Sequence, residues 1–171
     1  RRVNYDRAAI TEFLGDSLPL EEGQQCDYTR LWLSQETVGA RWRAIHERRV
    51  ANLLYIPNRS FQLGVVGTPR RIRRTDMMTL AQVWMTFLLF NIVPFGHVSD
   101  LNMPRCNLLY CLIREDITVD VASIISEEIH RFVNYEINKN NQKHKGALGF
   151  PALITTLCQA QGVEVELTLK I

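Results

Sequence analysis

The chain has 171 residues, of which 46% are hydrophobic and 22% are charged, and this composition is typical of a globular domain rather than a disordered segment. The 20 lysines and arginines exceed the 18 aspartates and glutamates by only +2, so overall charge alone does not predict nucleic-acid binding. The length favours a single domain over residues 1–171, with a core that folds without disulfides or metals.

Membrane and secreted proteins are not indicated. The longest apolar stretch, residues 80–93, is interrupted by Gln82, Thr86 and Asn91, so we expect no membrane span. The first residues lack the apolar segment of a secretory signal, and the absence of a starting methionine indicates a fragment of a longer chain. The four cysteines are widely spaced, which favours free thiols and a nuclear or cytoplasmic location.

The positive charge is concentrated in the first part of the chain. Residues 1–74 contain 13 arginines against 8 acidic residues, a net charge of +5, whereas residues 75–171 contain 7 basic and 10 acidic residues, a net charge of −3. The densest basic cluster directly follows a turn signal and consists of Arg70, Arg71, Arg73 and Arg74.

The first half of the chain predicts three helical segments. Residues 5–14 place their apolar side chains on one face, with Asn4 as a candidate amino-terminal cap and Gly15 as the terminating residue. Residues 26–33 and 35–48 carry weaker helical patterns.

A fourth helix is predicted to be the centre of the fold. Thr79 and Gln82 have the spacing of a capping box, and the helix that they open runs to about Asn91. Apolar side chains surround this helix on nearly all sides, so we expect it to be buried and the other helices to pack around it.

Three further helices follow. Asn102 and Pro104 are typical of a helix start and predict a helix to about residue 114. Residues 119–138 form the clearest amphipathic pattern, and residues 150–162 begin with a Phe-Pro pair and end at a glycine. Polar residues 138–149 predict a mobile loop.

Strand signals are few. Residues 53–56 and 61–63 are compatible with short strands or with loop anchors. Residues 163–171 alternate strictly between apolar and polar side chains and predict a strand that needs a pairing partner. The predicted fold is therefore mainly α, a single-domain helical bundle around a buried central helix, with a minor β element at the carboxyl end.

Motifs for catalysis, cofactors and metals are absent. No nucleophile elbow and no glycine-rich phosphate cradle occurs, and residues 64–67 are interpreted as a plain turn. Cys106 and Cys111 lie on one predicted helix, which argues against zinc. Glu115, Asp116 and Asp120 precede a helix, where the dipole favours acids. We therefore expect no enzyme, cofactor or small-molecule substrate, and a hydrolase or nuclease only if a cleft gathers the carboxylates.

The arginine cluster is the candidate functional site. Clustered arginines neutralise nucleic-acid phosphates or serve as a nuclear-import signal, so the site residues are predicted to be Arg70, Arg71, Arg73 and Arg74. Arg48 and Arg49 extend this patch if their helix lies alongside. The alternative interpretation is a solvated loop whose arginines pair with surface acids.

Several short motifs, taken in order, resemble one plant domain. They are a Leu-Ala-Gln-Val-Trp helix at residues 80–84, a Pro-x-x-His turn ending at His97, a Leu-Leu-Tyr-x-x-Ile helix at residues 108–113 and Phe-Pro-x-Leu-Ile-x-x-Leu-Cys at residues 150–158. Gly162-Val163 completes the pattern, while Asp120 departs from it. The chain therefore resembles the plant transposon protein domain, a mobile-element-derived domain of unknown function, over nearly its whole length.

This resemblance implies an origin in plant mobile elements and no established activity or cofactor. The resulting hypothesis is a non-enzymatic helical module that binds DNA or RNA through the arginine cluster. The alternative is a structural self-assembly module of the coat-protein kind, forming homo-oligomers, or another protein–protein interaction module.

Overall fold

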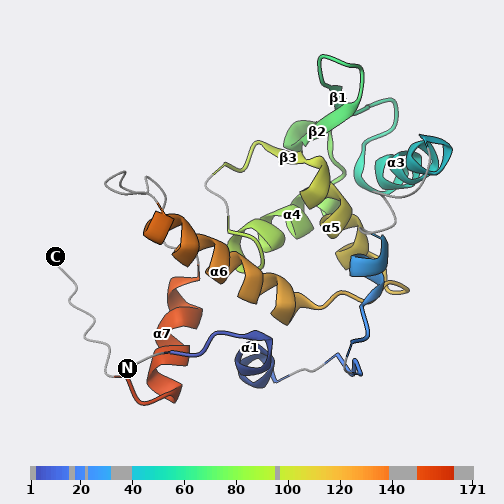
Figure 1. Ribbon diagram of the computed structural model, residues 1–171. Helices are drawn as coiled ribbons and strands as arrows, with labels where there is room; N and C mark the ends of the chain where they lie inside the picture. The colour runs from blue at the N-terminus through green and yellow to red at the C-terminus, as the bar shows by residue number, and fades with distance from the viewer. Residues whose placement is uncertain are drawn as a thin grey trace, which may run out of the picture. The chain divides into compact units, whose positions relative to one another are not determined.

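The computed structural model describes residues 3–15, 18–21, 23–31, 40–94, 97–138 and 150–163 (Figure 1). Over these residues the protein is mainly α-helical with one small antiparallel sheet, which confirms the predicted class. None of the described helices is long and apolar enough to cross a membrane.

The chain forms two compact units. Unit 1 comprises Arg1–Ser17, Phe90–Gly96 and Val121–Ile171, and unit 2 comprises Leu18–Leu89 and His97–Asp120. A single-domain organisation over residues 1–171 stays a prediction.

Unit 1 begins with helix α1 (Arg7–Leu14). A carboxylate oxygen of Asp6 accepts a hydrogen bond from the Ala9 amide at 2.9 Å, and the helix ends at Gly15, whose φ of 68° is left-handed. The predicted helix and its glycine end are confirmed. The cap is Asp6 rather than Asn4, because the Asn4 side chain accepts from the Asp6 amide instead.

Helix α6 (Val121–Asn138) packs against α1. Its buried face includes Ile125 and Ile129, as its amphipathic pattern predicts, and the ring of His130 lies 4.7 Å from that of Tyr5. The apolar face of α6 therefore forms part of the core of unit 1 where this helix packs against α1.

Helix α7 (Pro151–Ala160) has the predicted Pro start and is followed by Gly162 with φ 69°. The Gln161 side chain accepts from the Asn4 amide and donates to the Asn4 carbonyl, both at 2.7 Å. The end of this helix is thus tied to the beginning of the chain within unit 1.

The centre of unit 2 is helix α5 (Met103–Ile113). Asn102 caps it by accepting from the Arg105 amide at 3.2 Å, as predicted. Residues 106–111 are all buried, and the helix contacts α3 (Ala40–Leu54) and two strands of the sheet. Burial on all sides makes α5 the element around which this unit is organised.

The sheet of unit 2 consists of β1 (Gln62–Leu63), β2 (Pro69–Arg73) and β3 (Asp100–Asn102), antiparallel and in that order. Ile72 of β2 pairs with Leu101 of β3, and both side chains are buried. The signal at residues 61–63 is thus a strand, whereas residues 53–54 end α3 and Tyr55 forms only an isolated bridge with Met77.

The prediction of a central buried helix at residues 80–91 is wrong. Helix α4 (Thr79–Asn91) buries Ala81, Met85, Leu88 and Leu89 but leaves its other face open. Leu80, Val83 and Phe87 are 62%, 61% and 47% exposed. Apolar side chains all round a helix predict burial only if every face meets a neighbour, and here one face packs. The Gln82 side chain donates to the Met77 carbonyl at 2.9 Å instead of closing a capping box with Thr79.

Several predictions lie wholly or partly outside the described residues. These are the mobile loop at 138–149, the carboxyl-terminal strand at 163–171 and the segment 32–39 that ends one predicted helix and begins another. The four cysteines are free thiols, three of them buried.

A buried polar pair joins α3 to α5. Nε2 of His46 lies 3.2 Å from Oδ1 of Asn107, and the two residues are only 7% and 5% exposed. Burial lowers the pKa of His46 below its ordinary 6.5, although the bond to Asn107 opposes this shift. The folded protein therefore holds this imidazole in its neutral form.

The stability of unit 2 is expected to decrease as the pH falls below about 6.5, because the unfolded chain then protonates His46 and the folded chain does not. Between pH 7.5 and 5.0, the unfolding free energy of His46→Gln should decrease less than that of the original protein. Urea denaturation at the two pH values measures both. His97→Gln, at an exposed histidine, is the matched control. An unchanged pH dependence in His46→Gln would contradict this assignment.

Candidate functional site

The predicted basic cluster lies on one strand and the turn that follows it. Arg70, Arg71 and Arg73 belong to β2, and Arg74 begins the short 3-10 helix η1 (Arg74–Asp76). The structure therefore brings these four residues together, three of them in a sheet and the fourth in a 3-10 helix, rather than in a loop.

Two of these arginines have structural partners. An Nη atom of Arg71 donates to Oδ2 of Asp100 on β3 at 2.9 Å. An Nη atom of Arg74 donates to Oγ1 of Thr86 on α4 at 3.1 Å. These contacts connect β2 and the turn after it to their neighbours in unit 2, so only part of the cluster is available to a partner molecule.

The other two arginines point to solvent. Arg70 and Arg73 are exposed, and neither side chain has an ion pair or hydrogen bond to any residue that the structure describes. Between them Ile72 is fully buried and holds the strand against the core. The cluster therefore offers two unpaired guanidinium groups on one strand, at positions that strand alternation places on opposite faces and that are both exposed.

The turn between β1 and β2 projects beyond the helices of unit 2 (Figure 1). Val65 and Val66 lie at its centre and are the most exposed large hydrophobic residues in the described chain, at 105% and 88%. The sequence interpretation of residues 64–67 as a plain turn gave these valines no role. The sequence feature that could have identified them is the presence of two β-branched residues in a turn, where such residues are uncommon.

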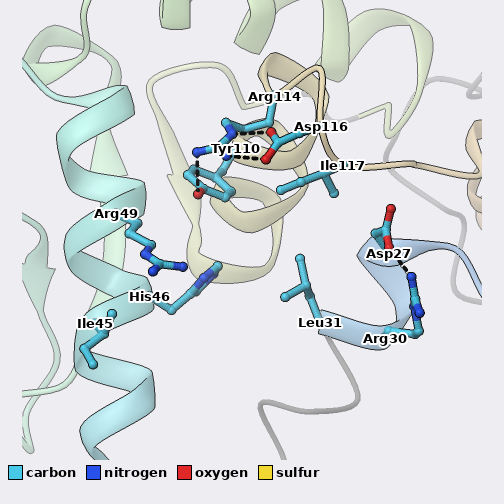
Figure 2. Close-up of a pocket in the computed structure, with 10 residues that line it drawn as sticks. All are labelled: Asp27, Arg30, Leu31, Ile45, His46, Arg49, Tyr110, Arg114, Asp116 and Ile117. Atoms are coloured by element: carbon cyan, nitrogen blue, oxygen red, sulfur yellow. Dashed lines mark hydrogen bonds and ion pairs between the residues drawn. The ribbon is translucent and has the colours of Figure 1, made fainter.

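Arg48 and Arg49 lie on α3 and are exposed. Arg49 lines a separate cavity of unit 2 with Arg30 and Arg114 (Figure 2). The membership of Arg48 and Arg49 in the same patch as the β2 arginines stays a prediction.

This cavity has a volume of about 560 Å³, within the range of small-molecule sites. Helix α3 forms one side and a helical turn at residues 27–31 the opposite side, with α5 and the loop after it between them (Figure 2). The side chains that line it are Asp27, Arg30, Leu31, Ile45, His46, Arg49, Tyr110, Arg114, Asp116 and Ile117.

Asp27 is anchored at the edge of the cavity. Its Oδ2 accepts from the backbone amide and the hydroxyl of Thr118 at 3.0 and 2.6 Å, and its other oxygen pairs with Arg30. These hydrogen bonds, led by the hydroxyl, lower the pKa of Asp27 to about 2. The carboxylate therefore stays ionised and is not a general base near neutral pH.

Arg114 is similarly compensated. Its Nε donates to Asp116 at 2.6 Å, a second nitrogen pairs with the other carboxylate oxygen, and a third lies 3.4 Å from the Tyr110 hydroxyl. Arg49 has no carboxylate partner among the described residues. With His46 neutral, three arginines and two aspartates leave the lining at +1, so the cavity favours an anion over a cation.

The described side chains around this cavity do not indicate a catalytic or metal site. Of the acidic residues Glu115, Asp116 and Asp120, only Asp116 lines the cavity, and it is ion-paired. Burial raises the pKa of the Cys111 thiol to about 12, which keeps it protonated at neutral pH. No group of three or more histidine, cysteine or acidic side chains in the described chain is arranged to hold a metal ion.

His97 is the last residue of the Pro-x-x-His motif and lies three residues before β3. Its Nε2 is 2.9 Å from the Ser99 hydroxyl and 4.0 Å from Oδ2 of Asp100. These contacts are those of a turn-bonding histidine, next to the Arg71–Asp100 pair.

The family described as "putative plant retrotransposon-related domain" matches residues 1–164. The chain belongs to this plant retrotransposon-related family. The predicted origin in a plant transposon is thereby confirmed. No curated protein and no solved structure matches the chain.

Proposed function

We propose that this plant retrotransposon-related domain is a non-enzymatic module that binds nucleic acid through the β1–β2 hairpin. The observation that carries the proposal is the pair of exposed arginines on β2, Arg70 and Arg73, neither of which has a partner among the described residues. Arginines without carboxylate partners bind phosphate oxygens, and each contact releases counterions. A nuclear or cytoplasmic location accords with such a partner and with the four free thiols.

The position of β2 within unit 2 supports this role. The strand is central in the sheet and is held by Ile72 and by the Arg71–Asp100 pair, so its arginines are presented on a defined element rather than on a loop. Backbone order lowers the entropy cost of placing a charge opposite a phosphate.

Replacing both exposed arginines tests the proposal directly. In Arg70→Gln/Arg73→Gln, the slope of log affinity against log salt concentration on duplex DNA should become shallower by about 2, because two phosphate contacts are lost. Fluorescence anisotropy over a salt series, with duplex DNA, single-stranded DNA and RNA, measures the slope and the preferred form.

The matched control is Arg43→Gln/Arg131→Gln, which removes the same charge from exposed positions on α3 and α6. It should leave the salt slope within about 0.5 of the original. Equal losses in the two double variants would show that only net charge matters, and the hairpin would then have no specific role.

Removal of Asp100 is expected to strengthen binding. Asp100→Asn releases Arg71 from its ion pair, so a third guanidinium becomes available and the salt slope should steepen by about 1. The pair is partly exposed, with 41% and 20% of the two side chains accessible, so the unfolding free energy should change by less than about 1 kcal/mol. Weaker DNA binding by a normally folded Asp100→Asn would argue against the proposed surface.

The open face of α4 favours a second candidate function, self-association. Leu80, Val83 and Phe87 follow one another at helical spacing, and all three are substantially exposed. Residues 79–91 contain no charged side chain, so two copies of this helix can pair without like-charge repulsion. The occupant that this face fits is therefore α4 of a second copy of the chain.

Self-association through α4 predicts a concentration-dependent rise in mass that Leu80→Gln/Val83→Glu abolishes. The added charge would be buried without a partner in the pair and should weaken association at least about tenfold. Sedimentation velocity measures the mass, and Leu63→Gln, at a leucine 62% exposed on β1, is the control. A monomer at all concentrations would leave the α4 face without this role.

A further inference from the structure

The hairpin tip, residues 64–67, carries apolar groups that the fold does not use. Val65 is 105% exposed and Val66 is 88% exposed, whereas no other large hydrophobic residue of the described chain exceeds 66%. A fully exposed aliphatic pair contributes nothing to the core, so its presence is not explained by stability.

The backbone of the tip makes the choice of valine more unusual. The Gly67 amide donates to the Gly64 carbonyl at 3.0 Å, and the Gly64 amide donates to the Thr68 carbonyl at 2.8 Å. Gly67 follows the turn with φ 73°, as in hairpin loops that end in a left-handed glycine. The two valines hold the central turn positions, where proline, aspartate, asparagine and serine are favoured and β-branched residues are not.

The surroundings of the tip are apolar and basic. Leu63, which precedes it, is 62% exposed and pairs with Pro69 across the hairpin. Residues 61–73 contain three arginines and no acidic residue. The tip therefore combines exposed apolar side chains with arginines that follow in β2. This combination complements a partner with a hydrophobic interior and a polyanionic surface.

We propose that Val65 and Val66 form a wedge that inserts between base pairs of duplex DNA from the minor groove, while Arg70 and Arg73 contact the flanking phosphates. This inference rests on the proposed nucleic-acid function and specifies duplex DNA as its partner. Apolar side chains on minor-groove binders unstack base steps in this way and kink the duplex. Arg70 follows Val66 by four residues and lies in β2, behind the tip.

The test compares an intact duplex with one that carries a central nick, where unstacking costs less. The original protein should bind the nicked duplex about tenfold more tightly and bring the duplex ends closer, measured by anisotropy and by energy transfer between end labels. Val65→Ser/Val66→Ser should lose the preference and the bending but keep the salt slope, because every charge remains.

Two controls make the outcome specific. Serine suits turn positions, so the double variant should keep the original circular dichroism spectrum and melting temperature. Ile56→Ser, at an isoleucine 40% exposed after α3 and outside both proposed surfaces, should keep the preference for the nicked duplex.

The failures of the two proposals are distinguishable. Equal affinity for nicked and intact duplexes, or a preference that survives Val65→Ser/Val66→Ser, overturns the wedge while an arginine-dependent salt slope still supports nucleic-acid binding. Absence of binding to any nucleic acid overturns both. Binding to phosphatidylserine vesicles that requires the valines, with no duplex bending, assigns the tip to a lipid surface and also overturns the wedge.

Discussion

The burial of Ile72 opposite Leu101 is the constraint on which the surface of unit 2 depends. The two residues are 0% and 1% exposed and pair across β2 and β3. Because successive strand side chains point to opposite faces, an inward Ile72 directs Arg71 and Arg73 outward. A register slip of one residue would turn those arginines into the core, where an unpaired guanidinium costs far more than one isoleucine contributes. The buried residue therefore determines where Arg71 and Arg73 lie, whereas Arg70, near the start of the strand, is exposed although it shares the face of Ile72.

The stability of this arrangement comes from the helix behind the sheet rather than from the charges. Residues 106–111 of α5 are buried without interruption and contact β2, β3 and α3. The Arg71–Asp100 pair is partly exposed, so it contributes only about 0–1 kcal/mol. Its effect is mainly on orientation and on charge, because it removes one cation from the outward face. A strand anchored by apolar contacts can present different numbers of free arginines with little change in the fold.

Local chemistry allowed part of the fold to be predicted. The start of α5 at Asn102 and the limits of α7 at Pro151 and Gly162 depend on capping and on backbone preferences, which a sequence displays directly. The β2 strand could not be predicted in this way. Only Ile72 is fully buried among its five residues, and three of the others are arginines, so no apolar alternation exists to detect. Its conformation is imposed by pairing with β3, which is distant in sequence.

The candidate site was likewise predictable only where it depends on local sequence and not where it depends on tertiary contacts. The sequence places four arginines within five positions, but which of them are free depends on Asp100 and Thr86, and their neighbourhood is a tertiary property. Arg49 illustrates the converse, because a position that looks like an extension of the cluster lies at a cavity with Arg30 and Arg114. Clustering in sequence predicts the location of charge more reliably than its availability.

Exposed apolar area has different consequences at the two places where unit 2 displays it. On α4 the exposed side chains lie on a helix without any charge, so the surface that complements them is neutral and apolar, such as another copy of the same helix. At the hairpin tip the valines are followed by unpaired arginines, and a neutral protein surface would leave those charges desolvated without compensation. A polyanion with an apolar interior satisfies both groups at once. The charge beside the apolar group, rather than the apolar area itself, therefore distinguishes the partner that we propose for the hairpin tip from the one that we propose for α4.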